Sequence, residues 1–95
     1  MKRKMGTDMG RQMMKSEAEI SIAAATADDL LEIGMKYCIG REVSLNLVAA
    51  HKWFNLAALK GSESAKQYRC EISREMSPAD VADAQRQARD WLTLH

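Results

Sequence analysis

The sequence predicts an all-α fold, an αα-hairpin stack of about four helices behind a flexible N-terminal leader. Apolar residues recur every three or four positions from residue 26 onward, which is the period of an amphipathic helix. Each such segment begins with a residue typical of helix N-caps. No segment alternates like a β-strand, and no Asn-Gly or Asp-Gly hairpin turn occurs. A chain of 95 residues has the length of one domain.

The first two helices are predicted from their start and stop signals. Thr26 and Asp29 make a capping box in which Asp takes the place of the usual Glu, and Asn46 is a good N-cap for the second helix. Gly40 and Gly61 are predicted to end these helices. The buried faces follow from helical spacing: Leu30, Leu31, Gly34, Tyr37 and Cys38 in the first helix, and Leu47, Ala50, Phe54, Ala57 and Ala58, flanked by Trp53, in the second.

The last two helices are predicted to begin at Ser62 and at Ser77. The second of these starts is a strong signal, because Ser at the N-cap is followed by Pro78 at the first helical position and by Asp80 at the third. Three- and four-residue steps define the two buried faces. They consist of Ala65, Tyr68, Ile72 and Met76 in the third helix, and of Val81, Ala84, Ala88, Trp91 and Leu92 in the fourth.

Residues 1–25 are interpreted as a flexible, basic, Met-rich leader to the helical domain at residues 26–95. The leader holds five basic and three acidic residues, and glycines interrupt its stripe of methionines. A misassigned start codon and an amphipathic helix at a membrane surface are the alternatives. No apolar run is long enough to span a membrane, and the leader lacks the apolar core of a signal peptide. The cytoplasm is therefore the expected location.

The sequence contains no recognisable catalytic, cofactor-binding or metal-binding motif. His51, which is expected to be exposed or half-buried, shows no zinc-ligand spacing with His95 or with the two cysteines. Cys38 and Cys70 are expected to be buried, inert thiols. Acidic residues interleave with the arginines of the last two helices, so specific nucleic-acid binding is not expected. The leader could contact phosphates without specificity. These observations favour a protein that is not an enzyme and needs no cofactor.

Residues 33–65 carry a pattern of small and aromatic residues in a fixed order. The pattern is Gly34, Tyr37, Gly40, Val43, Ala50, Trp53, Ala57, Ala58, Gly61 and Ala65. It resembles the Sel-one-like repeat, a relative of the tetratricopeptide repeat, and the end of the chain from Met76 resembles the closing helix of many bacterial members. Glu42 stands where the family usually has a second loop glycine, and Asn46 replaces the usual Asp.

The resemblance implies a scaffold for protein–protein interaction, and packing explains its signature. Gly34 is expected to let the first helix lie close to Ala57 and Ala58 of the second. Trp53 and Tyr37 are expected to fill the remaining space. Solenoids of this kind need about three repeats for a continuous core. A chain with one repeat is therefore expected to be marginally stable, or to be helped by self-association or by a partner.

Two kinds of partner contact are predicted. The first is a peptide or helix of another protein, which an adaptor of this class would bind through exposed polar positions: Lys36, His51, Lys52, Asn55 and Arg69. The alternative uses the apolar end of the chain, with Leu94 and His95 as the recognised residues. In that case the protein would be a small regulator or substrate of an ATP-dependent AAA+ protease, such as Lon. The simpler interpretation is that Trp91 and Leu92 cap the core and that the last residues fray.

Overall fold

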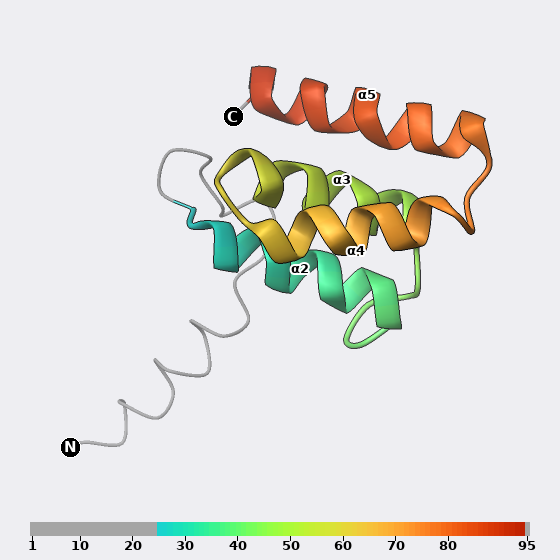
Figure 1. Cartoon of the computed structure of the whole chain (residues 1–95), viewed down its shortest axis with the longest axis horizontal. Coiled ribbons are helices and arrows are strands. Elements are labelled where there is room, and N and C mark those ends of the chain that lie inside the picture. The colour runs from blue at the N-terminus through green and yellow to red at the C-terminus, as the bar shows by residue number, and fades with distance from the viewer. Residues whose placement is uncertain (1–24, 95) are drawn as a thin grey trace.

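The computed structural model describes residues 25–94, which form four helices and contain no strand. These helices are α2 (Ala27–Ile39), α3 (Leu47–Leu59), α4 (Glu63–Ser73) and α5 (Pro78–Leu94), joined by short connections (Figure 1). The predicted all-α fold is confirmed for this part of the chain. The predicted leader lies outside the described residues except for Ala25, and so does His95.

Helix α3 is the centre of the fold, because α2, α4 and α5 all pack against it. Its composition explains this position, since a helix that is apolar on several sides must be covered on several sides. Six of its residues are buried: Ala50, His51, Trp53, Phe54, Leu56 and Ala57. Helix α4 makes at most slight contact with α2 and α5. Helix α5 therefore packs on α3, and the two helices run in the same direction (Figure 1).

All four predicted helix starts are confirmed by local hydrogen bonds. In each case a side-chain oxygen accepts the backbone N–H of the residue three positions later, at 3.0 Å. The pairs are Thr26–Asp29, Asn46–Ala49, Ser62–Ala65 and Ser77–Asp80. At the first start, Asp29 also accepts the N–H of Thr26 at 3.0 Å, which completes the predicted capping box. These side chains satisfy N–H groups that have no partner inside the helix.

Two glycines produce the turns after α2 and α3, as predicted. Gly40 has a φ of 72° and ends α2, while Gly61 has a φ of 108°. Beyond α3, the N–H groups of Gly61 and Ser62 donate to the carbonyls of Ala58 and Ala57, both at 3.0 Å. This is the pattern of a Schellman motif, which requires the left-handed conformation that glycine adopts easily. It turns the chain within a few residues and allows α4 to begin at Glu63.

The contact between α2 and α3 is centred on the ring of Phe54. A Cβ atom at Gly34 would lie 2.6 Å from both Cδ1 and Cε1 of this ring, so only glycine fits there. The three atoms nearest to such a Cβ all belong to Phe54, a contact that the sequence pattern did not predict for Gly34. The ring of Tyr68 from α4 stacks on Phe54 with centroids 5.5 Å apart. One aromatic side chain thus joins three helices.

Helix α5 is held by a pair of tryptophans. Trp53 and Trp91 meet edge to face, with ring centroids 5.2 Å apart, and both are buried. Trp53 therefore lies in the core, and not at the flank of the buried face as the helical spacing predicted. The reason is that α5 covers a second side of α3. Leu92, which was placed on the buried side of α5, is 38% exposed.

Candidate functional site

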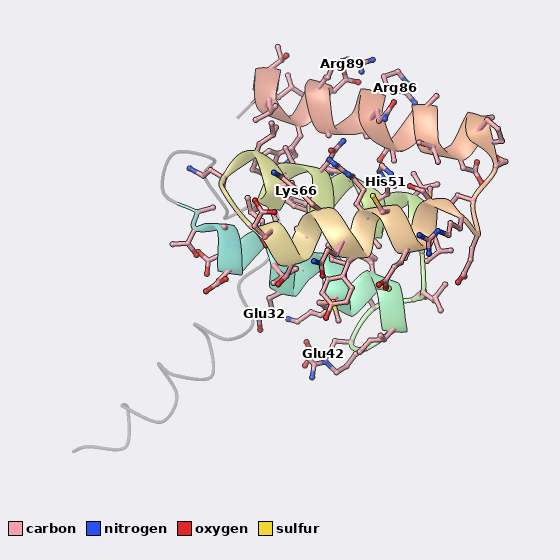
Figure 2. The ribbon with its side chains drawn as sticks, viewed as in Figure 1. Glu32, Glu42, His51, Lys66, Arg86 and Arg89 are labelled. Carbon is pink, nitrogen blue, oxygen red and sulfur yellow. The ribbon has the colours of Figure 1, made fainter. Side chains whose placement is uncertain are left out.

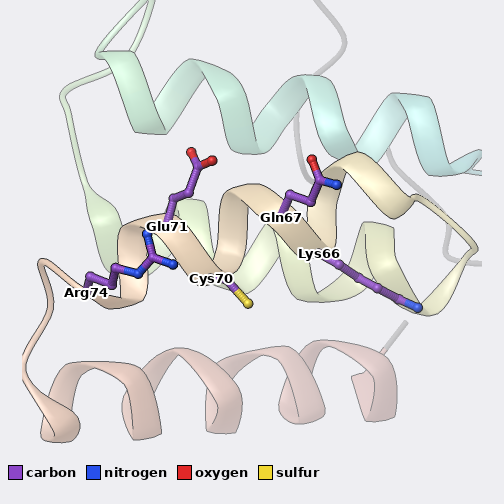
Figure 3. Close-up of a pocket in the computed structure, with 5 residues that line it drawn as sticks. All are labelled: Lys66, Gln67, Cys70, Glu71 and Arg74. Atoms are coloured by element: carbon purple, nitrogen blue, oxygen red, sulfur yellow. The ribbon is translucent and has the colours of Figure 1, made fainter.

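The outward face of α4 carries an open depression of about 310 Å³ (Figure 3). Its lining residues are Lys66, Gln67, Cys70, Glu71 and Arg74. They share one face of the helix because they are one, three or four positions apart. Ala65 and Ile72 occupy the opposite face and are buried against the core. The depression follows from the packing of α4, which contacts α3 with one side only.

The side chains that line this depression are mostly polar and include both positive and negative charges. Lys66 and Arg74 supply cationic donors, Glu71 supplies an anionic acceptor, and Gln67 supplies both a donor and an acceptor. The lysine ammonium lies 3.2 Å from the carboxylate of Glu63, but both side chains are exposed, so this ion pair contributes little. Such a surface can hydrogen-bond to a peptide without enclosing it.

The two cysteines lie in different environments. Cys70 is exposed, so the prediction that it is buried is wrong. Its position on α4 explains this, because it lies on the side opposite Ile72. Cys38 is half-buried on α2. Burial raises the pKa of the Cys38 thiol, and the carboxylates of Glu75 and Glu71 add to this effect.

His51 is buried in the core and not exposed or half-buried as predicted. Only 1% of the residue is accessible, and it lies where α4 and α5 both cover α3 (Figure 2). The ring Nε2 lies 3.0 Å from Oγ of Ser73, which in turn donates to the carbonyl of Arg69 at 2.8 Å. Burial lowers the pKa of the His51 ring, and the positive charge of Arg69 lowers it further. A buried ring cannot meet a partner directly, so the prediction of His51 as a contact residue is corrected.

The other predicted contact residues are engaged with neighbours inside the domain. The ammonium of Lys36 lies 2.9 Å from the carboxylate of Glu42, and that of Lys52 lies 4.5 Å from the ring centroid of Trp53. Arg69 donates to the side-chain oxygen of Asn55, which links α4 to α3. Asn55 and Arg69 are thus brought together, and the charge of Arg69 also acts on the ring of His51.

The depression on α4 was not predicted from the sequence, where the expected contact residues lie mainly on the second helix. A signal for it exists in the sequence. Lys66, Cys70 and Arg74 recur every four residues, and Gln67 and Glu71 run beside them, which marks one polar stripe along α4. That this stripe is left uncovered could not be predicted, because coverage depends on where α5 packs.

The end of α5 leaves large apolar side chains in solvent. Leu94 is 78% exposed, and Leu92 is partly exposed one position after the buried Trp91. Leu94 is still helical, so the predicted fraying is not seen at this residue. His95, the other predicted residue of the tail, lies outside the described residues.

Within residues 25–94, no three His, Cys, Asp or Glu side chains are grouped so that they could hold a metal ion. No helix in this range is both long and apolar enough to cross a membrane. Comparison of the chain with protein-family models, with curated proteins and with solved structures gave no match.

Proposed function

We propose that this protein is an interaction module of the Sel-one-like class that binds a peptide or helix of another protein along the outward face of α4. The observation that supports this proposal is the open depression lined by Lys66, Gln67, Cys70, Glu71 and Arg74. A helix of a repeat protein that is covered on one side only offers its other side to a partner. The proposed site of action is the cytoplasm, and the proposed role is that of an adaptor without catalytic activity.

The partner surface that fits this face is polar and carries both charges. An acidic group of the partner would meet Lys66 or Arg74, and a basic group would meet Glu71. The face is short, since α4 spans only Glu63–Ser73, so the contact would be smaller than a standard stable interface. We therefore propose weak, reversible binding that the arrangement of charges makes selective.

A matched pair of charge reversals tests the proposal. Full-length protein carrying Lys66→Glu is compared with protein carrying Arg89→Glu, which makes a similar change on the exposed face of α5 (Figure 2). A partner is first identified by affinity purification and mass spectrometry, and its Kd is then measured by calorimetry. Lys66→Glu is expected to raise the Kd about tenfold or more, the loss of roughly 1.4 kcal/mol, and Arg89→Glu to leave it unchanged. Equal effects of the two changes would contradict the proposal.

A second function is favoured by the exposed leucines at the end of α5. We propose as the alternative that Leu94 and its neighbours are gripped by a AAA+ protease such as Lon, so that the protein is its substrate or regulator. Removing Leu94 and His95 tests this idea in cells. A longer lifetime of the shortened protein, with binding at α4 intact, would support it. Unchanged turnover of the shortened protein, together with unchanged partner binding, would contradict this alternative.

A further inference from the structure

His51 is a buried titratable residue that the proposed binding face does not use. It belongs to α3, and its ring forms a hydrogen bond across to Ser73, the last residue of α4. The second ring nitrogen, Nδ1, is buried without a hydrogen-bond partner there. Buried polar atoms nearly always have a hydrogen-bond partner, so a buried nitrogen without one is unusual and is a candidate functional group.

The hydrogen bonds determine which ring nitrogen carries the proton. Ser73 has a single hydroxyl hydrogen, and it donates this hydrogen to the carbonyl of Arg69 at 2.8 Å. Oγ of Ser73 can then only accept from His51, so Nε2 must be the protonated nitrogen. Nδ1 is consequently a bare lone pair in the core. The ring is neutral in this arrangement. A contact with the backbone of His51 itself favours a second proton, but burial of the ring opposes that proton more strongly.

The charged surroundings also oppose a second proton. From α4, the guanidinium of Arg69 acts on the ring and disfavours a positive charge there. This guanidinium is held in place by Asn55, one turn beyond His51 on α3. Within the described residues, no charged group of α2 or α5 acts on the ring to offset this effect.

Helix α4 is the shortest helix within residues 25–94 and is held mainly by its contact with α3. It has 11 residues, and only Ala65 and Ile72 among them are buried. It packs on α3 and has at most slight contact with α2 and α5. Helices this short are not stable alone in water, so α4 depends on its contact with α3.

We propose that His51 is an acid-operated latch between α3 and α4, which holds α4 in place while the ring is neutral and releases it when Nδ1 takes up a proton. When α4 separates from α3, the imidazolium of His51 becomes hydrated and moves away from the positive charge of Arg69. It also separates Tyr68 from Phe54, whose rings stack in the closed form. Acidification therefore dismantles the face of α4 and uncovers apolar surface on α3.

The direction of the pH dependence follows from proton linkage. In the released form the ring is solvated, so its pKa is near the ordinary value of 6.5, whereas in the closed form the pKa is lower. Above pH 6.5 the ring is mostly neutral in both forms, so the closed form has its full stability there. Below that value the closed form loses stability until the pH reaches the pKa of the closed form. Over this window the opening constant of α4 rises up to about tenfold for each pH unit.

The test uses the full chain and two NMR measurements. The first follows the Cε1–H signals of His51 and His95 through a pH titration, with His95→Ala to assign them. The second follows amide hydrogen exchange in α4 and α2 of the same molecule, corrected for the intrinsic effect of pH. We expect His51 to titrate below the ordinary pKa of a histidine ring, and α4 opening to increase up to about fivefold from pH 6.5 to pH 5.5 while α2 changes less.

His51→Gln is the matched variant, because its amide N–H can still donate to Ser73 but does not titrate in this range. Its α4 opening is expected to be independent of pH between 6.5 and 5.5. The proposal is overturned if this variant shows the acid response of the wild type. It is equally overturned if the wild-type His51 ring titrates at 6.5 with no change in α4, or if α2 and α4 open together. The last two outcomes need no variant, so a failure of His51→Gln to fold leaves the test intact.

Discussion

Glu42 has a backbone conformation that residues with a side chain usually avoid. Its φ is 70°, and it is the one residue other than glycine with a positive φ in the described chain. A positive φ of this size is one that glycine adopts easily, because glycine has no side chain to clash with the backbone. Lys36 compensates in part, since its ammonium lies 2.9 Å from the Glu42 carboxylate. This contact lowers the pKa of Glu42.

Glycine at position 42 is predicted to give a more stable protein than alanine. Both Glu42→Gly and Glu42→Ala remove the contact with Lys36, but only alanine retains the strain of a left-handed conformation. That strain costs about 1–2 kcal/mol, less the entropy cost of ordering glycine. We expect Glu42→Gly to exceed Glu42→Ala in free energy of unfolding by about 1 kcal/mol, measured by urea denaturation. A more stable alanine variant would show that the loop is not strained at this position.

At the scale of the elements, the approach of α2 to α3 is set by one close contact. The backbone of Gly34 lies against the buried ring of Phe54, where a Cβ atom would come within 2.6 Å of two ring carbons. Glycine in the interior of a helix normally weakens it. Here the cost is offset by the closer packing of two helices.

Gly34→Ala is therefore predicted to destabilise the protein although alanine is the better helix former. Overpacking in a core costs about 1–3 kcal/mol, against a gain in helix propensity of about 1 kcal/mol. We expect a net loss of about 1 kcal/mol in the free energy of unfolding, measured by chemical denaturation. The same change in a Phe54→Leu background provides the control, because the ring that clashes is then absent. There Gly34→Ala should be neutral or stabilising, and an equal loss in both backgrounds would refute the steric explanation.

At the scale of the whole molecule, the fold depends on a small core around a single helix. Within residues 25–94 the buried apolar residues number 12, and α3 contributes five of them: Ala50, Trp53, Phe54, Leu56 and Ala57. The other helices each meet α3 and have few contacts with one another. Loss of α3 packing should therefore unfold every helix together, as in a two-state domain.

A core of this size predicts marginal stability. We expect the purified protein to melt in one cooperative transition at or below about 65 °C at pH 7.5, the upper end of the range for mesophilic domains. If self-association contributes, the midpoint should rise with protein concentration. Calorimetry at two concentrations, combined with sedimentation velocity, measures both effects. A monomer that melts well above 65 °C would show that a core of this size is sufficient by itself.

The sequence by itself determined the helices and their limits. Capping by Thr26, Asn46, Ser62 and Ser77 was predicted correctly because each cap acts on a residue three positions away. The turns at Gly40 and Gly61 were predicted for the same reason, since a positive φ is a local property. Helical periodicity also identified most of the buried residues.

Only the tertiary structure decided which side of each helix remains uncovered. Trp53 and His51 are buried because α5 packs on α3, and α4 keeps an open face because α5 does not cover it. The same arrangement leaves Cys70 exposed and brings Ser73 to the ring of His51. These contacts join residues more than a dozen positions apart. The period of one helix gives no information about them, because burial depends on the neighbours that a helix acquires.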